Sequence, residues 1–253
     1  MQPHLSTYPL HPISPSTLQK TTAAWKPELI ITSGITELDR LLGGYKPGQL
    51  TLLDGNSSLI TQMPYRLCVN TYQTFHSPTV YIDGGMAANP YHIAHYARLR
   101  ELNQHHVLSQ VHISRAFTVY QLATLIQDRL ETLIQKQHPR TLLIGMFPAL
   151  YLDPDITSHE AQTLLKHNLD QLTQLARRHN LITILTHRDR TLVPMQRNLR
   201  KIIYTTMHEI VRLQQANHDV HINLVKQHRA TTIRSTQPGQ RCLEDYIRPH
   251  ATA

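Results

Sequence analysis

The clearest chemical feature of the sequence is a run of positive charge between residues 187 and 201. This segment holds five arginine or lysine residues and a single acidic residue, Asp189. Guanidinium and ammonium groups clustered on a loop suit contacts to phosphates, which position a nucleic acid without reading its sequence. The predicted contact residues are Arg188, Arg190, Arg197, Arg200 and Lys201. A solvated basic loop and a contact to an acidic partner subunit are the alternative interpretations.

A second segment has the composition of an incomplete phosphate-binding loop. Gly55-Asn56-Ser57-Ser58-Leu59-Ile60-Thr61 follows an apolar run and precedes a helical stretch. A phosphate loop needs glycines so that backbone N–H groups converge on phosphate, a lysine for the charge, and a serine or threonine for Mg²⁺. Gly55 and Thr61 meet two of these needs, but the segment contains no lysine.

The composition of the chain indicates its cellular compartment and the charge of its binding partner. The 253 residues carry a formal net charge of +8, which favours an anionic partner. No apolar run approaches the roughly 18 residues of a membrane span, and the N-terminal residues do not resemble a secretory signal. The spacing of Cys68 and Cys242 does not match any known pattern of metal ligands. We expect the 18 histidines to lie mainly on a polar surface. We therefore expect a cytoplasmic protein with no metal site and no membrane contact.

Apolar strand-like runs alternate with helical stretches from residue 29 onward, as in a mostly parallel sheet covered by helices. The predicted strands are Gln49–Asp54, Thr79–Asp83, Val107–Ser114, Thr141–Met146 and Leu181–Thr186, then a C-terminal antiparallel hairpin of Glu209–Gln214 and Val220–Lys226, extended by Thr231–Thr236. The predicted helices are Gln62–Phe75, Tyr91–Leu102, Val119–Lys136 and His159–His179. This pattern predicts an α/β core at 29–236, a flexible arm at 1–28 with a short helix near Thr17–Trp25, and a tail at 237–253.

Several motifs, in a fixed order, resemble the RecA/RadA/KaiC ATPase superfamily. SGITELDRLLGG (33–44), Gly48, the strand TLLDG and the helix start Thr61-Gln62 follow the order of the entry to that family's core. VYIDGG resembles its second strand, SRAFTVYQLATLI its "ARA" stretch, and TLLIGMFPALY its Walker B strand. The resemblance covers residues 29–236 and implies a RecA-like P-loop NTPase core.

The same resemblance implies that the residues for ATP hydrolysis are absent. Ile60 stands where the family has its phosphate-loop lysine, Gly145 where it has the Walker B aspartate, and Gly85 where it has the general-base glutamate. Together these losses remove electrostatic stabilisation, metal and base. We therefore expect a pseudo-ATPase with no cofactor, whose degenerate nucleotide site retains Gly55 and Thr61.

Oligomerisation signals are mixed. In KaiC-like relatives a Lys-x-Arg group reaches the neighbouring subunit's nucleotide, and Lys226 and Arg229 are the corresponding residues here, spaced by three rather than two. Lys226 and Arg229 could therefore lie at a subunit interface or at the solvated end of a strand, and the sequence does not decide between the two. The aromatic-x-x-Ala hook of filament-forming relatives does not occur in residues 1–30. A small homo-oligomer, or a heteromer with an active RecA/RadA-type protein, is the expected assembly.

Three hypotheses follow for function. The first is a catalytically inactive RecA/RadA-like paralog that binds single- or double-stranded DNA, an active recombinase, or both, and assists recombination or repair. The second is a non-catalytic RecA-like scaffold subunit of an Elongator-type ring or another multisubunit assembly. The third is an enzyme with a rebuilt nucleotide site.

Overall fold

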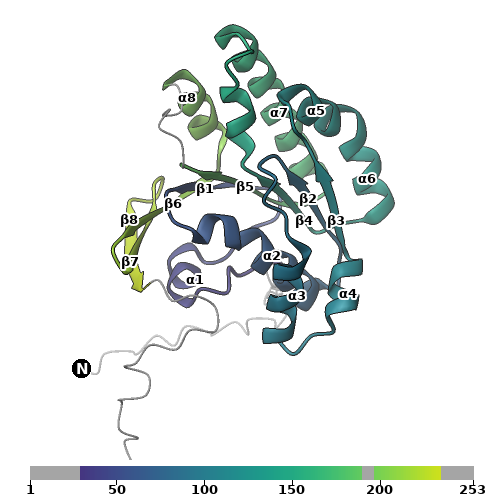
Figure 1. Ribbon diagram of the computed structural model, residues 1–253, viewed down its shortest axis with the longest axis vertical. Coiled ribbons are helices and arrows are strands. Elements are labelled where there is room, and N and C mark those ends of the chain that lie inside the picture. The colour runs from purple at the N-terminus through teal and green to yellow at the C-terminus, as the bar shows by residue number, and fades with distance from the viewer. Residues whose placement is uncertain (1–28, 190–196, 235–253) are drawn as a thin grey trace, which may run out of the picture.

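The computed structural model describes residues 29–189 and 197–234 and shows one sheet between two layers of helices (Figure 1). The predicted arm at 1–28, its helix near Thr17–Trp25 and the predicted tail at 237–253 lie outside the described residues. Arg190 and Cys242 also lie outside them, whereas Cys68 is a buried free thiol.

The sheet has eight strands in the order β3-β2-β4-β5-β1-β6-β7-β8. Their bounds are β1 Leu50–Gly55, β2 Thr79–Asp83, β3 Val111–Arg115, β4 Thr141–Gly145, β5 Ile182–Arg188, β6 Glu209–Ala216, β7 Asp219–Leu224 and β8 Arg229–Arg234. The first six strands in this order run parallel, while β7 and β8 pair antiparallel. The predicted mostly parallel sheet with a C-terminal antiparallel hairpin is confirmed.

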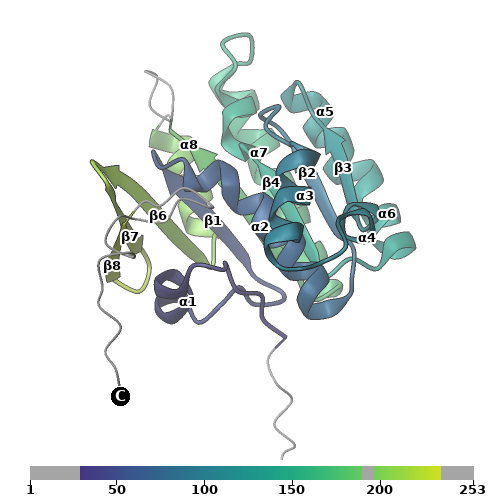
Figure 2. The same ribbon diagram turned by 60° about the horizontal axis from the view of Figure 1, so that its bottom comes forward.

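Helices cover both faces of this sheet (Figure 2). One layer holds α1 Thr36–Leu42, α2 Leu59–Phe75, α3 Pro90–Leu99 and α4 Gln104–Ser109; the other holds α5 Val119–Thr124, the π-helical η1 Leu125–Arg129, α6 Leu130–Gln137, the 3-10 helix η2 Phe147–Leu152, α7 Ser158–Arg178 and α8 Arg197–Thr206. Successive strand residues point to opposite faces. In β1, Leu50 and Leu52 therefore enter the core under α7, and Leu53 enters the core under α2.

Three predicted elements differ from the observed ones. The predicted strand Val107–Ser114 was wrong in its first half, because Asn103 caps α4 by accepting hydrogen bonds from the N–H groups of His105 and His106. The predicted helix Val119–Lys136 is interrupted by η1. The basic segment predicted as a loop forms α8 from Arg197 onward. Within the described ranges, no helix combines the length and hydrophobicity needed to span a membrane.

Candidate functional site

The carboxyl ends of the parallel strands bring the predicted nucleotide-site residues to one edge of the sheet. Gly55 at the end of β1 pairs with Arg188 at the end of β5, and Asp83 at the end of β2 pairs with Gly145 at the end of β4. This edge is where open α/β sheets bind ligands. The structure therefore gathers the sequence-predicted positions in one place.

Four backbone N–H groups between Ser57 and Thr61 already have partners within the chain. Their bonds are Ser57 N to Leu213 O (3.3 Å), Leu59 N to Ser57 Oγ (3.3 Å), Ile60 N to Ser57 O (3.2 Å) and Thr61 N to Ser58 O (3.2 Å). A phosphate-binding loop directs such N–H groups at the ligand instead. Here these four donors bond to β6 and to the loop itself.

The side chains at the start of α2 are equally closed to a ligand. Ile60 is completely buried in the apolar core beneath α2. The Thr61 hydroxyl donates to the carbonyl oxygen of Ser58 at 2.8 Å, so it points at the backbone of its own turn. The first turn of α2 therefore presents no charge where a triphosphate would need one.

Neighbouring side chains fill the space that two carboxylates would occupy. A Cβ placed on Gly145 would lie 3.0 Å from the Tyr81 hydroxyl oxygen. A Cβ placed on Gly85 would lie 2.4 Å from Cγ of Met146, which real side chains do not tolerate. The Met146 N–H donates to Thr186 Oγ1 at 3.0 Å, which fixes the backbone of Met146. Neither glycine position has room for an acidic side chain without rearrangement.

Asp83, the acidic residue that β2 keeps, supports the loop that follows it. Its buried carboxylate accepts hydrogen bonds from the N–H groups of Gly85 (3.2 Å), Ala87 (3.0 Å) and Ala88 (2.8 Å). Arg115 Nε lies 3.6 Å from the same carboxylate. Asp83 therefore organises the β2–α3 connection.

Helix α8 carries three of the predicted nucleic-acid contacts on one side. Arg197, Arg200 and Lys201 are all exposed and are spaced by three and four residues, so they share a helix face. Leu199 and Ile203 are buried in the core against which α8 packs. Within residues 29–189 and 197–234, no carboxylate is paired with any of these three cations. We refer to Arg197, Arg200 and Lys201 as the α8 stripe.

Arg188 occupies a different place from the α8 stripe. It is half-buried at the end of β5, and its Nε donates to the Asn56 carbonyl oxygen at 3.3 Å. The five-residue contact set that we predicted is therefore divided: Arg188 lies against the loop after β1, three residues form the α8 stripe, and Arg190 is outside the described residues.

Comparison with known families is decisive at this point. The family model described as Rad51 matches residues 26–197, more than half of the chain. The chain belongs to the Rad51 family. A search of curated proteins finds no match. Membership makes this a RecA-like protein related to the recombinases of DNA recombination and repair, as the motif order predicted.

The Rad51-family core also contains a polar cluster that the sequence did not reveal. Asp54, His187, Tyr204 and Arg212, which we call the anchor cluster, come from β1, β5, α8 and β6. Asp54 Oδ1 lies 3.0 Å from His187 Nδ1, and Arg212 Nη2 donates to Asp54 Oδ2 at 3.1 Å. Tyr204 donates its hydroxyl hydrogen to the same Oδ2 and accepts from Arg212. The anchor cluster ties α8 to the end of β1.

Charge stabilises the ionised form of Asp54 in this cluster. Burial alone would raise the pKa of Asp54, but hydrogen bonds from His187 and Tyr204 and the positive charge of Arg212 lower it to about 2. Burial and the bond to Asp54 raise the pKa of Tyr204 to about 12. The only signal in the sequence was an acidic residue inside the apolar run Leu50–Gly55.

Lys226 and Arg229 lie at the opposite edge of the sheet. Lys226 N donates to Oε1 of Glu209 (3.3 Å), the first residue of β6, and its ammonium group donates to the Met207 carbonyl oxygen just beyond α8. Arg229 begins β8 and contacts Gln227 Oε1 at 3.4 Å. The pair does not join the loop after β1 of its own chain, and its role at a subunit interface stays a prediction.

Proposed function

We propose that this Rad51-family protein binds DNA, alone or with an active RecA/RadA-type partner, and assists recombination or repair without hydrolysing ATP. The observation that carries the proposal is the closed first turn of α2. There the fully buried Ile60 takes the place of a charged side chain, and the N–H groups are used internally.

Loss of hydrolysis follows from the number of missing charges. Removing one preorganised oxyanion donor costs an enzyme about 10²–10³ in rate. The loop after β1 lacks a lysine, and glycines at positions 85 and 145 supply no carboxylate, with Met146 and Tyr81 crowding the space beside them. We therefore expect the protein to lack all three requirements for hydrolysis: a residue that binds the metal, a general base and a cation that neutralises the phosphates.

Binding of DNA is assigned to the α8 stripe. Its three cations project from one side of a helix whose other side is fixed in the core. Each phosphate that a protein neutralises on double-stranded DNA steepens the dependence of log affinity on log salt by about 0.9. If the stripe makes three such contacts, it contributes about 2.7 to that slope.

Fluorescence anisotropy with a labelled oligonucleotide over a salt series tests this assignment. The variant R197A/R200A/K201A is compared with R40A/R98A/R129A, which removes the same charge, from +8 to +5, at exposed helical arginines elsewhere. We expect the first variant to bind more weakly and with a shallower salt slope than the second. Equal slopes for both variants would assign DNA binding to another surface or leave the scaffold hypothesis as the better one.

A phosphate-release assay with ATP and Mg²⁺, with and without DNA, tests the loss of hydrolysis. We expect no release above a protein-free control. Turnover that disappears in Thr61→Ala would overturn the proposal, because Thr61 holds the metal-binding position of the loop. A pull-down from native extract with and without nuclease then shows whether a recombinase partner binds directly or through nucleic acid.

A further inference from the structure

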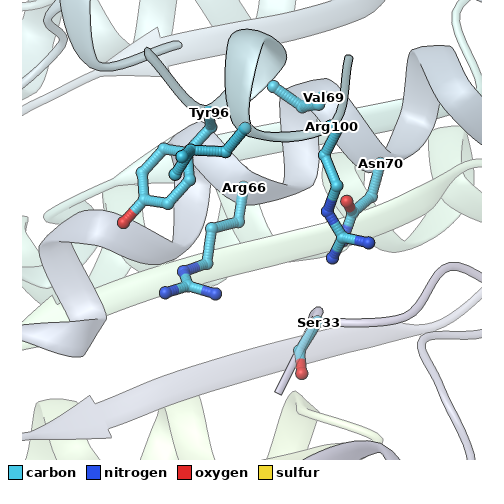
Figure 3. Close-up of a pocket in the computed structure, with 7 residues that line it drawn as sticks. Ser33, Arg66, Val69, Asn70, Tyr96 and Arg100 are labelled. Atoms are coloured by element: carbon cyan, nitrogen blue, oxygen red, sulfur yellow. The ribbon is translucent and has the colours of Figure 1, made fainter. Parts of the chain in front are cut away.

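A small pocket with both polar and apolar walls lies between the middle of α2, the end of α3 and the segment before α1 (Figure 3). Its volume is about 140 Å³, and its walls include Arg66, Arg100, Asn70 and Ser33. None of these residues belongs to the loop after β1, the anchor cluster or the α8 stripe. The pocket is therefore separate from the candidate site described above.

Two guanidinium groups converge on this pocket. Arg66 from α2 and Arg100 from the end of α3 both direct their guanidinium groups toward the segment that contains Ser33 (Figure 3). A side chain begun on Gly34 would start 3.0 Å from Arg100 Nη2 and 3.9 Å from Arg66 Nη1. Two like charges this close to one point repel each other unless an anion lies between them.

No carboxylate of the chain supplies that anion within the part that the structure describes. Asp39 is the acidic side chain that contacts the same segment, and it is occupied by the N–H groups of Ser33 (2.6 Å) and Gly34 (3.1 Å). The Nε atom of Arg66 is buried and has no hydrogen-bond acceptor among the described residues. A buried donor without an acceptor is costly, so the Arg66 guanidinium that lines the pocket carries an unmet hydrogen-bonding need.

The pocket is also held in shape before any ligand binds. The Arg66 guanidinium lies over the Tyr96 ring, 4.9 Å from its centroid, and Nη1 reaches the Gly34 carbonyl oxygen at 3.5 Å. The buried Asn70 donates to the Thr32 carbonyl oxygen at 2.8 Å, which fixes the segment opposite the arginines. An arginine fork that is already oriented loses less entropy when it binds an oxyanion.

We propose that this pocket binds a phosphate group between Arg66 and Arg100. Paired guanidinium forks match the geometry of phosphate oxygens. A volume of about 140 Å³ is below the roughly 300 Å³ of sites that enclose a drug-sized ligand, so the phosphate enters and a whole nucleotide does not. The phosphate belongs either to a nucleic-acid backbone or to a free phosphate or phosphomonoester.

The test uses the full chain and three single variants. Arg100→Gln removes one exposed guanidinium and leaves the core intact. Arg66→Lys keeps the charge but loses the planar fork. Arg98→Gln, in the last turn of α3 and outside the pocket, is the matched control for Arg100→Gln. Calorimetric titration with inorganic phosphate, at an ionic strength held constant with chloride, measures affinity for each protein.

We expect Arg100→Gln and Arg66→Lys to weaken phosphate or DNA binding about tenfold or more, because hydrogen bonds to charged groups are the strong ones. Arg98→Gln is expected to match the unaltered protein. Weaker phosphate binding with unchanged oligonucleotide binding identifies a small phosphate ligand, whereas weaker oligonucleotide binding identifies the nucleic-acid backbone.

Equal behaviour of Arg100→Gln and Arg98→Gln with both probes overturns the proposal. So does the absence of any binding of either probe above the chloride background. The variant R197A/R200A/K201A separates this inference from the DNA assignment of α8, because it is expected to keep binding at the pocket. Each of the two proposals can therefore fail while the other stands.

Discussion

Replacing Asp54 with asparagine tests whether the anchor cluster stabilises the fold and holds α8. The substitution preserves size but removes the negative charge that faces His187, Tyr204 and Arg212. Asp54 is buried, so its partners cannot exchange it for water without cost. We expect Asp54→Asn to fold, to be less stable, and to loosen α8 relative to the sheet.

The size of the effect follows from the pKa of Asp54. That pKa is about 2 in the folded protein against an ordinary value of 3.8, because the cluster favours the carboxylate. Because the pKa of Asp54 is lower in the folded than in the unfolded protein, its ionisation stabilises the fold at pH values above about 3.8. This contribution is lost as the pH falls from 3.8 toward 2. The difference corresponds to about 2.4 kcal/mol at neutral pH, of which about half remains near pH 3.

Urea unfolding of the unaltered protein, Asp54→Asn and Asp170→Asn across this pH range measures the effect. Asp170 is exposed on α7, so its substitution is expected to change stability by less than about 0.5 kcal/mol. The gap between the unaltered protein and Asp54→Asn is expected to be about 2–3 kcal/mol near neutrality and to narrow below about pH 4. A gap that equals that of Asp170→Asn, or that persists unchanged in acid, would refute the reasoning.

Three further predictions concern the loop after β1 and α8. Ile60→Lys is expected to lower the unfolding free energy by at least about 2 kcal/mol in urea and to release no phosphate from ATP, because the charge enters an apolar core; a stable, ATP-hydrolysing variant would contradict this. Gly55→Ala is expected to cost about 3 kcal/mol or more, since its Cβ would lie 2.2 Å from the Leu213 carbonyl oxygen at a φ of +133°. Gly43→Ala, at a φ of +74° with no atom near its Cβ, is the control for backbone strain without the clash and is expected to cost less. Leu199→Ala is expected to cost about 2–5 kcal/mol and to speed hydrogen exchange in α8, and unchanged exchange there would argue against its packing role.

The sheet could be predicted from the sequence because its parallel strands are buried on both faces. Such strands appear as short continuous apolar runs, and β2 Thr79–Asp83 was predicted with its observed bounds. The start of β3 was not, because Val107 looks equally apolar in a strand and on the buried side of α4. Local capping by Asn103 decided between the two, and its signal is weaker than that of a hydrophobic run.

Helix α8 was missed although the sequence contained a sign of it. The run of positive charge favoured a loop, but Leu199 and Ile203 are spaced by four residues and both are buried. The anchor cluster had no comparable sign, because its hydrogen bonds to Asp54 span 133 to 158 residues of chain. Only the strand order brings β1, β5 and β6 together, so these partners became evident with the topology.

The charge balance at the carboxyl edge of the sheet supports the proposed loss of ATP hydrolysis independently of the missing lysine. Asp54 and Asp83 place two carboxylates at the ends of β1 and β2, where they pair with the partly exposed side chains of Arg212 and Arg115. Asp83 is kept from the family motif, so the repulsion toward an incoming triphosphate comes from Asp54, and the triphosphate would also have to compete with Asp54 for Arg212. Restoring one lysine at Ile60 leaves that repulsion in place. The α8 stripe has no carboxylate partner in the described parts of the chain. Its three positive charges can therefore bind the phosphates of another molecule.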